Sequence, residues 1–173
     1  MANEYISIGK FVATFGIKGQ LVLEHDLGEG ATLDGIQAIF VEGNLGELLP
    51  HFLVSSSLKN DHEFHVLLEG VDSPEKAKKF VRKKAWLYES DAKKRATSSA
   101  PLSMLGYTVM DSKKALGNVL EVIEQPNQLL LRIELQGKEV LLPVNESTLQ
   151  KIDHKNQKIF LILPEGLLEI YLN

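Results

Sequence analysis

Residues 8 to 19 read Ile8-Gly9-Lys10-Phe11-Val12-Ala13-Thr14-Phe15-Gly16-Ile17-Lys18-Gly19, and this run sets the type of fold for the first half of the chain. Apolar residues alternate with small or polar ones over Tyr5–Ala13, and the pattern resumes at Leu21–Leu23. A period of two is typical of a half-buried strand, and glycines between two such runs supply the positive φ angles of a turn. The sequence therefore predicts a β-hairpin that turns at Gly16 and Gly19.

The expected tip of this hairpin carries Phe15, Ile17 and Lys18. These side chains would contribute little to a core, whereas an aromatic, an aliphatic and a cation on one exposed loop suit contact with a macromolecule. The loop holds no catalytic group. It also lacks the Lys-Ser/Thr ending of a P-loop and no helical pattern follows it, so phosphate binding there would depend on Lys18 alone.

Further short β-like runs lie on both sides of one expected helix. We expect Asp72 or Ser73 as the N-cap of that helix, Pro74 in its first position and a capping box between Asp72 and Glu75. Strands this short and this closely spaced favour a small barrel or sandwich. The runs are Leu21–His25, Gln37–Val41, Leu49–Ser55, His65–Leu68 and Ala85–Tyr88.

Apolar periodicity is lost over Ser90–Pro101, which we interpret as a linker. The β pattern then resumes as three expected hairpins without βαβ alternation, which favours a second small barrel over a nucleotide-binding α/β fold. We expect an N-terminal domain at 1–90, a linker at 91–101 and a C-terminal domain at 102–173. The expected hairpin strands are Tyr107–Met110 with Leu116–Glu124, Leu129–Leu135 with Lys138–Leu142, and Leu149–Ile152 with Lys158–Leu163.

The tail Gly166–Leu172 is too apolar to remain in solvent. We expect it to fold back on the second barrel or between the two domains, with a partner-binding role as the alternative.

Charge is distributed unevenly along the chain. The net charge is −4, yet residues 1–70 hold 10 acids against 3 bases, while Lys76–Arg95 holds 9 bases against 2 acids. A charge run of this kind is commonly a solvated helix face plus a linker. The alternative is a strip that lies close to RNA phosphates. We call this set the basic strip: Lys78, Lys79, Arg82, Lys83 and Lys84.

The chain has no cysteine, which excludes disulfides, thiolate nucleophiles and cysteine metal ligands, and permits a reducing cytoplasm. The opening residues Met1-Ala2-Asn3-Glu4 show neither the basic nor the apolar region of a secretory signal, and no apolar run approaches the length of a membrane span. A cytoplasmic protein without a membrane partner is expected.

No catalytic or metal site is predicted. His62-Glu63-Phe64-His65 invites a metal interpretation, but the segment looks extended and residues three apart on a strand point to opposite faces. Ser55-Ser56-Ser57 lacks the context of a nucleophile elbow and is expected to be a polar loop. Glu24 and Asp26 are expected to be solvated charges at a strand end.

Five segments in chain order resemble the RimM family of ribosome maturation factors. The first is the Gly-Lys strand with the Phe-Gly-Ile-Lys-Gly turn, already quoted. The others are Leu68–Ala77, which is similar to the family's connection into a short helix, Leu105–Tyr107 through Gly117–Val119, which resembles the opening of its PRC barrel, and two closing motifs, Leu141–Pro143 and Leu163–Leu168. The resemblance covers essentially the whole chain.

The resemblance implies an all-β fold with one short helix and a linker, made of a six-stranded barrel like those of translation factors and reductases, followed by a PRC barrel. It also implies a non-enzymatic assembly factor that needs no cofactor and acts as a monomer. Such a factor would bind the head of the immature 30S subunit through ribosomal protein S19, and would promote folding and processing of the 16S rRNA head domain.

The chain departs from the family pattern just before the PRC barrel. Some members carry an aromatic pair there, whereas this chain reads Ser99-Ala100-Pro101-Leu102-Ser103-Met104 and has no aromatic before Tyr107. Partner-binding residues are therefore predicted at Phe15, Ile17, Lys18, Leu102, Met104 and Tyr107, with core packing as the favoured alternative for Tyr107.

Two other functional classes compete with this interpretation. A general RNA-binding barrel would bind naked rRNA with a steep salt dependence, which the acidic body of the chain disfavours. An enzyme that acts on rRNA would need a nucleophile, a metal or a base, and the sequence offers no such constellation.

Overall fold

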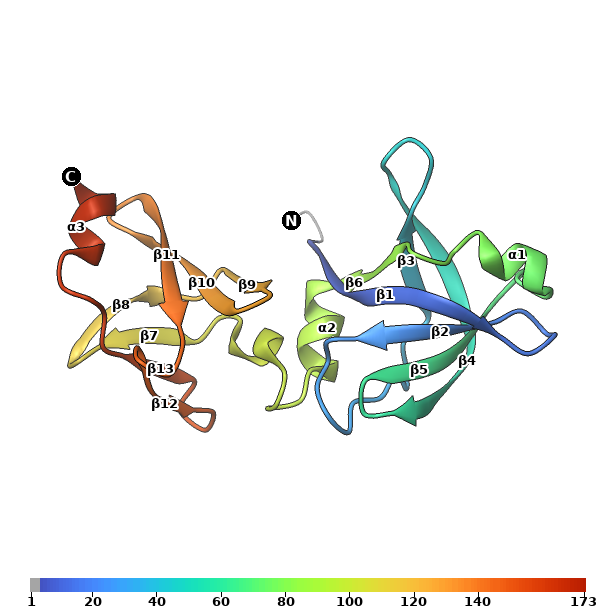
Figure 1. The fold of residues 1–173 in the computed structure, drawn as a ribbon, viewed down its shortest axis with the longest axis horizontal. Coiled ribbons are helices and arrows are strands. Elements are labelled where there is room, and N and C mark those ends of the chain that lie inside the picture. The colour runs from blue at the N-terminus through green and yellow to red at the C-terminus, as the bar shows by residue number, and fades with distance from the viewer. Residues whose placement is uncertain (1–3) are drawn as a thin grey trace. The chain divides into compact units, whose positions relative to one another are not determined.

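The computed structural model describes residues 4–173, so Met1, Ala2 and Asn3 of the segment tested for a secretory signal lie outside the described residues. The chain divides into two compact units, one ending at Ala100 and one spanning Pro101–Asn173 (Figure 1). The first unit is a closed barrel of six strands, which confirms the expected six-stranded barrel, and its strand order is β1-β2-β5-β4-β3-β6. Its strands are β1 (Tyr5–Phe15), β2 (Gln20–His25), β3 (Ala38–Glu42), β4 (Leu48–Asn60), β5 (Glu63–Leu68) and β6 (Lys84–Tyr88).

The predicted first hairpin is confirmed. β1 pairs antiparallel with β2 from Gly9–His25 to Phe15–Gln20, and a bulge interrupts the register between Phe11 and Ala13. Gly9 has φ 153°, and a Cβ there would collide with the backbone carbonyl of Glu24. Glycine is therefore required at this close approach of two strands.

Alternate side chains along the strands point inward and fill the barrel interior, as the sequence patterns predict. The inward side chains are buried, and β5 shows the simplest case, since Phe64, Val66 and Leu68 are buried while the residues between them are half-exposed. Burial of these apolar side chains is the main stabilising term of the unit. Other fully buried members are Ile8, Phe11, Leu21, Leu23, Ile39 and Leu87.

The serine run does not form the predicted loop. Ser55, Ser56 and Ser57 lie within β4 and pair with β5, where Ser56 is opposite Val66 and Ser57 is opposite His65. Barrel closure overrides their weak strand propensity, because the ladder with β5 satisfies their backbone groups.

Helix α1 (Pro74–Lys78) follows β5 and is only five residues long. Ser73 is its N-cap and accepts a hydrogen bond from the Lys76 backbone N–H at 3.3 Å. The predicted capping box is replaced by an ion pair of Asp72 with the Lys76 ammonium at 2.8 Å. Phe80, just beyond the helix, meets the rings of Phe11 and His51 edge-on, at centroid distances of 6.1 and 4.9 Å.

The segment 91–101 is not an irregular linker throughout. Helix α2 spans Glu89–Arg95 and buries Ala92, and residues up to Ala100 belong to the first compact unit. The acids of its first turn and the bases of its last turn both interact favourably with the helix dipole. These charges hide the single buried position from a search for apolar periodicity.

The second unit begins with the 3-10 helix η1 (Pro101–Met104) and forms two sheets. One sheet has the order β11-β10-β9 and the other β12-β13-β7-β8, in which β13 and β7 are parallel. The strands are β7 (Thr108–Asp111), β8 (Lys114–Asn118), β9 (Glu121–Gln125), β10 (Gln128–Leu135), β11 (Lys138–Val144), β12 (Leu149–Asp153) and β13 (Lys158–Leu161).

The single strand predicted over Leu116–Glu124 is instead two strands in different sheets. The Val119 N–H donates to the Tyr107 carbonyl, whereas the Leu120 N–H donates to the Arg132 carbonyl, each at 2.8 Å. The backbone thus changes partner within one peptide unit. Periodicity cannot reveal this change, because the apolar alternation continues across it.

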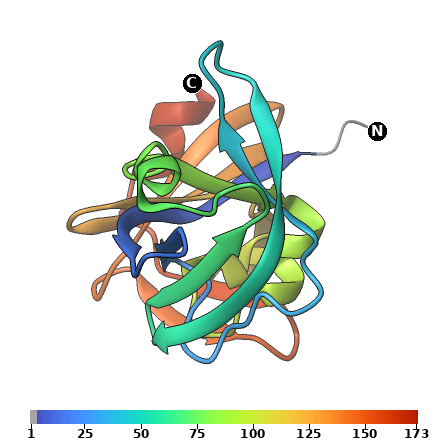
Figure 2. The same ribbon diagram turned by 90° about the vertical axis from the view of Figure 1, so that its right-hand side faces the viewer.

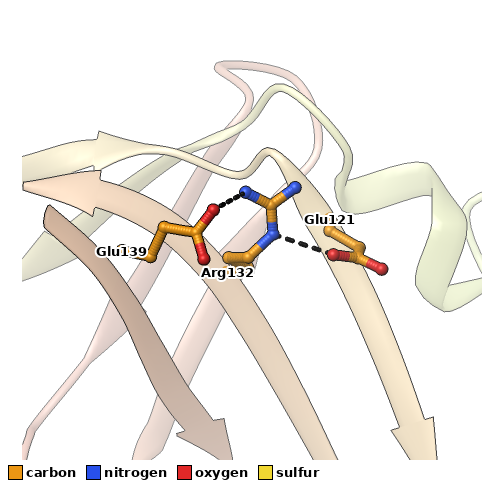
Figure 3. Close-up of polar contacts among 3 residues, drawn as sticks. All are labelled: Glu121, Arg132 and Glu139. Carbon is orange, nitrogen blue, oxygen red and sulfur yellow. Dashed lines mark hydrogen bonds and ion pairs between the residues drawn. The ribbon is translucent and has the colours of Figure 1, made fainter. Parts of the chain in front are cut away.

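An ion-pair cluster spans the three-stranded sheet (Figure 3). Arg132 of β10 contacts Glu121 of β9 through Nε at 2.8 Å and Glu139 of β11 through one terminal nitrogen at 3.1 Å. The cluster therefore ties all strands of this sheet together on its outer face.

The apolar tail folds back on the second unit, one of the two placements expected for it. It forms α3 (Leu167–Leu172), where the Tyr171 hydroxyl donates to the Leu141 carbonyl of β11 at 3.4 Å and Lys138 donates to the Leu172 carbonyl at 3.0 Å. Ile170 nevertheless remains 77% exposed. Among residues 4–173, no helix has the length and apolar character required to cross a bilayer.

Candidate interaction surfaces

The β1–β2 tip presents the three predicted side chains to solvent. Ile17 is 83% exposed and Phe15 49% exposed, and Lys18 is exposed as well. The ring of Phe15 stacks on His65 of β5, with centroids 4.2 Å apart. This contact fixes one side of Phe15 and leaves the other open to a partner.

The backbone of the tip is also fixed. Gly16 and Gly19 have φ angles of 68° and 85°, the left-handed values predicted for the turn. Gly19 lies against the backbone of Val71 and Ser73, where a Cβ would collide with the Val71 carbonyl oxygen, whereas Gly16 faces open space. A loop held this way loses little conformational entropy on binding.

The three candidates near the start of the second unit differ in exposure. Leu102 is half-buried, whereas Met104 and Tyr107 are only 4% and 8% exposed. The Tyr107 hydroxyl forms a hydrogen bond with Nδ1 of His154 at 3.1 Å. Tyr107 therefore packs within its own unit, in agreement with the alternative preferred for it, and Leu102 is the most accessible of the three.

The basic strip runs from the end of α1 into β6. Lys78, Lys79, Arg82 and Lys84 are exposed, and Lys83 is half-buried with its ammonium donating to the Glu42 carbonyl at 3.4 Å. Within residues 4–173, no carboxylate forms an ion pair with any of these five side chains. By contrast, Lys59 and Lys76 are paired with Glu63 and Asp72. The strip thus carries uncompensated positive charge on an acidic protein.

The β3–β4 hairpin projects from the barrel beside the strip (Figures 1 and 2). Glu47 stabilises its tip by accepting the Leu45 N–H at 2.9 Å, and Leu45 itself is 92% exposed. A groove of about 860 Å³ lies between this hairpin and residues 79–83, and its walls include His51, Lys79 and Phe80. Burial lowers the pKa of His51, and the positive charge of Lys83 lowers it further. This groove therefore favours a neutral imidazole beside its ammonium groups.

A second groove of about 390 Å³ lies beside the first and shares Glu42, Gly43, Asn44 and Lys83 with it. Its other walls include Arg82, Lys84 and Trp86. The sequence predicted the cations but not their placement around an aromatic ring, because this arrangement depends on the pairing of β6 with β1 and β3.

The histidine segment does not assemble a metal site in the part of the chain that the structure describes, since no three potential ligands from His, Asp or Glu gather there. Glu63 binds Lys59 and Asn60, and these contacts lower the pKa of the Glu63 carboxyl. His65 faces Phe15 instead. Glu24 and Asp26 are both exposed, as predicted.

Fold and sites together define a two-domain, all-β protein whose candidate sites are a fixed hairpin tip and a basic, grooved surface. Residues 6–92 match the RimM N-terminal domain, and residues 102–167 match the RimM PRC barrel domain. The chain belongs to the RimM family of ribosome maturation factors.

Curated relatives have similar lengths. The ribosome maturation factor RimM of Parabacteroides distasonis is 33% identical over 173 residues, covering 97% of this chain and 98% of that protein. The factor of the same name from Christiangramia forsetii is 29% identical over 172 residues and covers 98% of both chains. Among solved structures, the RimM 16S ribosomal RNA processing protein of Pseudomonas aeruginosa is 20% identical, covers 93% of this chain and 98% of its own, and has a TM-score of 0.45.

Proposed function

We propose that this protein binds the head of the immature 30S subunit through ribosomal protein S19 and promotes folding and processing of the 16S rRNA head domain. The main support is the match of both domains to RimM families, together with full-length relatives named as ribosome maturation factors. The protein acts in the cytoplasm, as a monomer, without catalytic chemistry and without a cofactor.

The mechanism is a shift of population. A factor that binds the correctly folded head more tightly than competing conformations raises the fraction of correct particles, and needs no reaction of its own. Release follows when mature contacts occupy the same surface. A preference of tenfold corresponds to about 1.4 kcal/mol, which a few side chains at an interface can supply.

The proposed protein contacts begin at the β1–β2 tip. Phe15, Ile17 and Lys18 combine exposure with a fixed backbone, and the open face of Phe15 suits an apolar pocket on the partner. Leu102 belongs to the same proposal because it is partly accessible. Met104 and Tyr107 were predicted as partner-binding residues too, but both are buried, so Leu102 is the proposed contact of this segment.

The proposed RNA contacts are the five cations of the basic strip. Their lack of carboxylate partners within the described residues leaves them available for phosphates. The rest of the chain is acidic, so the strip would orient the factor on rRNA without binding RNA in general.

Titration of purified S19 against the protein tests the proposed contact. Ile17 is 83% exposed in the free protein and would bury its apolar area against the partner. Ile17→Ala should therefore weaken binding several-fold, because most of that buried apolar area is lost. Leu45→Ala is the matched control, since Leu45 is a 92% exposed aliphatic residue on another hairpin tip of the same barrel. Equal affinities of the Ile17 variant and the unmodified protein would remove the tip from the interface, and no binding by either would remove S19 as the partner.

A further inference from the structure

The smaller groove combines cationic side chains with an aromatic ring. It is lined by Arg82, Lys83 and Lys84 on one side and by Glu42, Gly43 and Asn44 of the β3–β4 hairpin on the other, with Trp86 as its aromatic wall. The Lys83 ammonium donates to the Glu42 carbonyl at 3.4 Å, whereas Arg82 and Lys84 have no ion-pair partner within residues 4–173 and are the more accessible cations. The groove therefore attracts an anion.

Trp86 supplies a flat surface beside these cations. It lies on the outer face of β6, opposite Ser7 of β1 and Phe40 of β3, and it is half-buried. Its indole Nε1 is enclosed and has no hydrogen-bond partner within the described residues, so the ring is held by packing. Lys84 is two residues earlier on the same strand and shares this outer face.

Two of the cations that line this groove, Lys84 and Arg82, have energetically unfavourable surroundings or backbone conformation. Lys84 lies directly opposite Lys10 of β1, and both are exposed, although like charges across a strand pair destabilise a sheet. Arg82 has φ 76°, a left-handed conformation that is costly outside glycine, while its N–H donates to the Phe11 carbonyl at 2.8 Å. Costs of this kind commonly accompany binding sites, where charge and backbone serve a ligand.

We propose that this groove binds unpaired nucleotides of RNA, with a base against the indole of Trp86 and the flanking phosphates on Arg82 and Lys84. An aromatic face beside cations is the usual combination for single-stranded nucleic acid. An acidic peptide would pair with the cations, but its carboxylates would not stack on the indole. The volume of about 390 Å³ is within the range of small-ligand pockets. The inference rests on the proposed role in rRNA folding and names the RNA feature recognised.

The single tryptophan of the chain makes the test direct. The intact protein is titrated with a single-stranded hexaribonucleotide of mixed sequence while Trp86 fluorescence is followed. We expect quenching that saturates, because a stacked base quenches the indole. Absence of any change at millimolar RNA would overturn the proposal.

A pair of variants with equal charge change separates the site from general attraction. Arg82→Gln/Lys84→Gln should weaken RNA binding at least tenfold and make the log–log salt slope shallower by about 1.4, the value for two phosphate contacts on a single strand. Lys93→Gln/Lys94→Gln removes two exposed cations from α2 and should leave both quantities within about twofold. Equal losses in the two variants would overturn the assignment of the groove.

Trp86→Phe tests the stacking step with a fluorescently labelled RNA, and circular dichroism verifies the fold. A smaller aromatic ring should reduce affinity while the salt slope stays unchanged. Competition by a hexaglutamate peptide at the same concentration as the RNA would overturn the choice of RNA as ligand.

Hexaribonucleotide binding and subunit binding are measured separately, so the groove and the maturation role can fail independently. If hexaribonucleotide binding is absent but the protein still co-sediments with immature small subunits, the groove proposal fails and the maturation role stands. If RNA binds at the groove but no subunit is bound, the maturation role fails.

Discussion

Phe15 of the hairpin tip and His65 of β5 are stacked, with centroids 4.2 Å apart and planes at 16°. They are fifty residues apart in sequence, and their strands, β1 and β5, do not pair with each other. The contact therefore holds the Phe15 ring, the aromatic side chain of the tip, against the barrel wall.

This stacking should be measurable as a coupling energy. Single variants Phe15→Ala and His65→Ala and their double variant form a thermodynamic cycle, and urea unfolding should give a coupling of about 0.5–1.5 kcal/mol, as for other aromatic pairs. Strictly additive losses would mean that the rings do not interact in solution.

The glycines of the same tip should respond differently to substitution. Gly19→Ala should lower the free energy of unfolding more than Gly16→Ala, because alanine at 19 meets the Val71 carbonyl in addition to the cost of a positive φ. Gly16→Ala should cost about 1 kcal/mol, the backbone term alone. Thermal or urea unfolding of the two variants measures the difference, and equal losses would show that the tip does not pack against Val71.

A stability change at mildly acidic pH is expected from His25. Its side chain is 3% exposed, stacks on Phe64 at 4.1 Å and accepts the Leu27 N–H at Nδ1. Burial lowers the pKa of His25 below its ordinary 6.5, and the nearby His62 lowers it further. On acidification the unfolded chain therefore binds a proton before the folded chain does, so stability falls as pH drops below about 6.5 and is unaffected by this group above about pH 7.5.

Two histidine variants isolate that contribution. His25→Gln should be less stable at neutral pH, because the stacking on Phe64 is lost, but its stability should decline less between about pH 7 and pH 5 than that of the unmodified protein. His62→Gln should retain most of the decline, since burial is the larger cause of the shifted pKa. Parallel pH profiles for the protein and His25→Gln would contradict the assignment.

The Arg132 cluster predicts a graded response. Glu121→Gln should cost more stability than Glu139→Gln, because Glu121 is closer to Arg132, at 2.8 Å against 3.1 Å, and less exposed, at 52% against 74%. Both losses should stay below about 1 kcal/mol and shrink in about 1 M salt, as for partly exposed ion pairs. The reverse order in urea unfolding would mean that Glu139 is the principal partner.

Local patterns predicted the strands of the first barrel because each strand has one buried face, which imposes alternation. They did not predict the exchange of partners at Val119 and Leu120, since both sheets need the same alternation. Helix α2 was missed because Ala92 alone is buried among charges. Ser55–Ser57 were assigned to a loop because serine favours turns, yet barrel closure requires a strand there.

The candidate sites divide in the same manner. The exposure of the tip residues was predictable from sequence, since a glycine-bounded turn is exposed wherever the barrel forms, while their role in binding stays a prediction. The run of cations in the basic strip is visible in the sequence, but the position of Trp86 beside them depends on strand order, which no local pattern specifies. The burial of Met104 was missed for a related reason, because a short 3-10 helix has too few residues to show a face.

The proposed maturation role requires a preference for immature particles. Co-sedimentation of the purified protein with immature 30S subunits, mature 30S subunits and whole ribosomes, with free S19 as competitor, measures this preference. We expect strong binding to the immature particle, weaker binding to the mature subunit and ribosome, and release by S19. Equal binding to all three particles, or binding that S19 does not reduce, would contradict it.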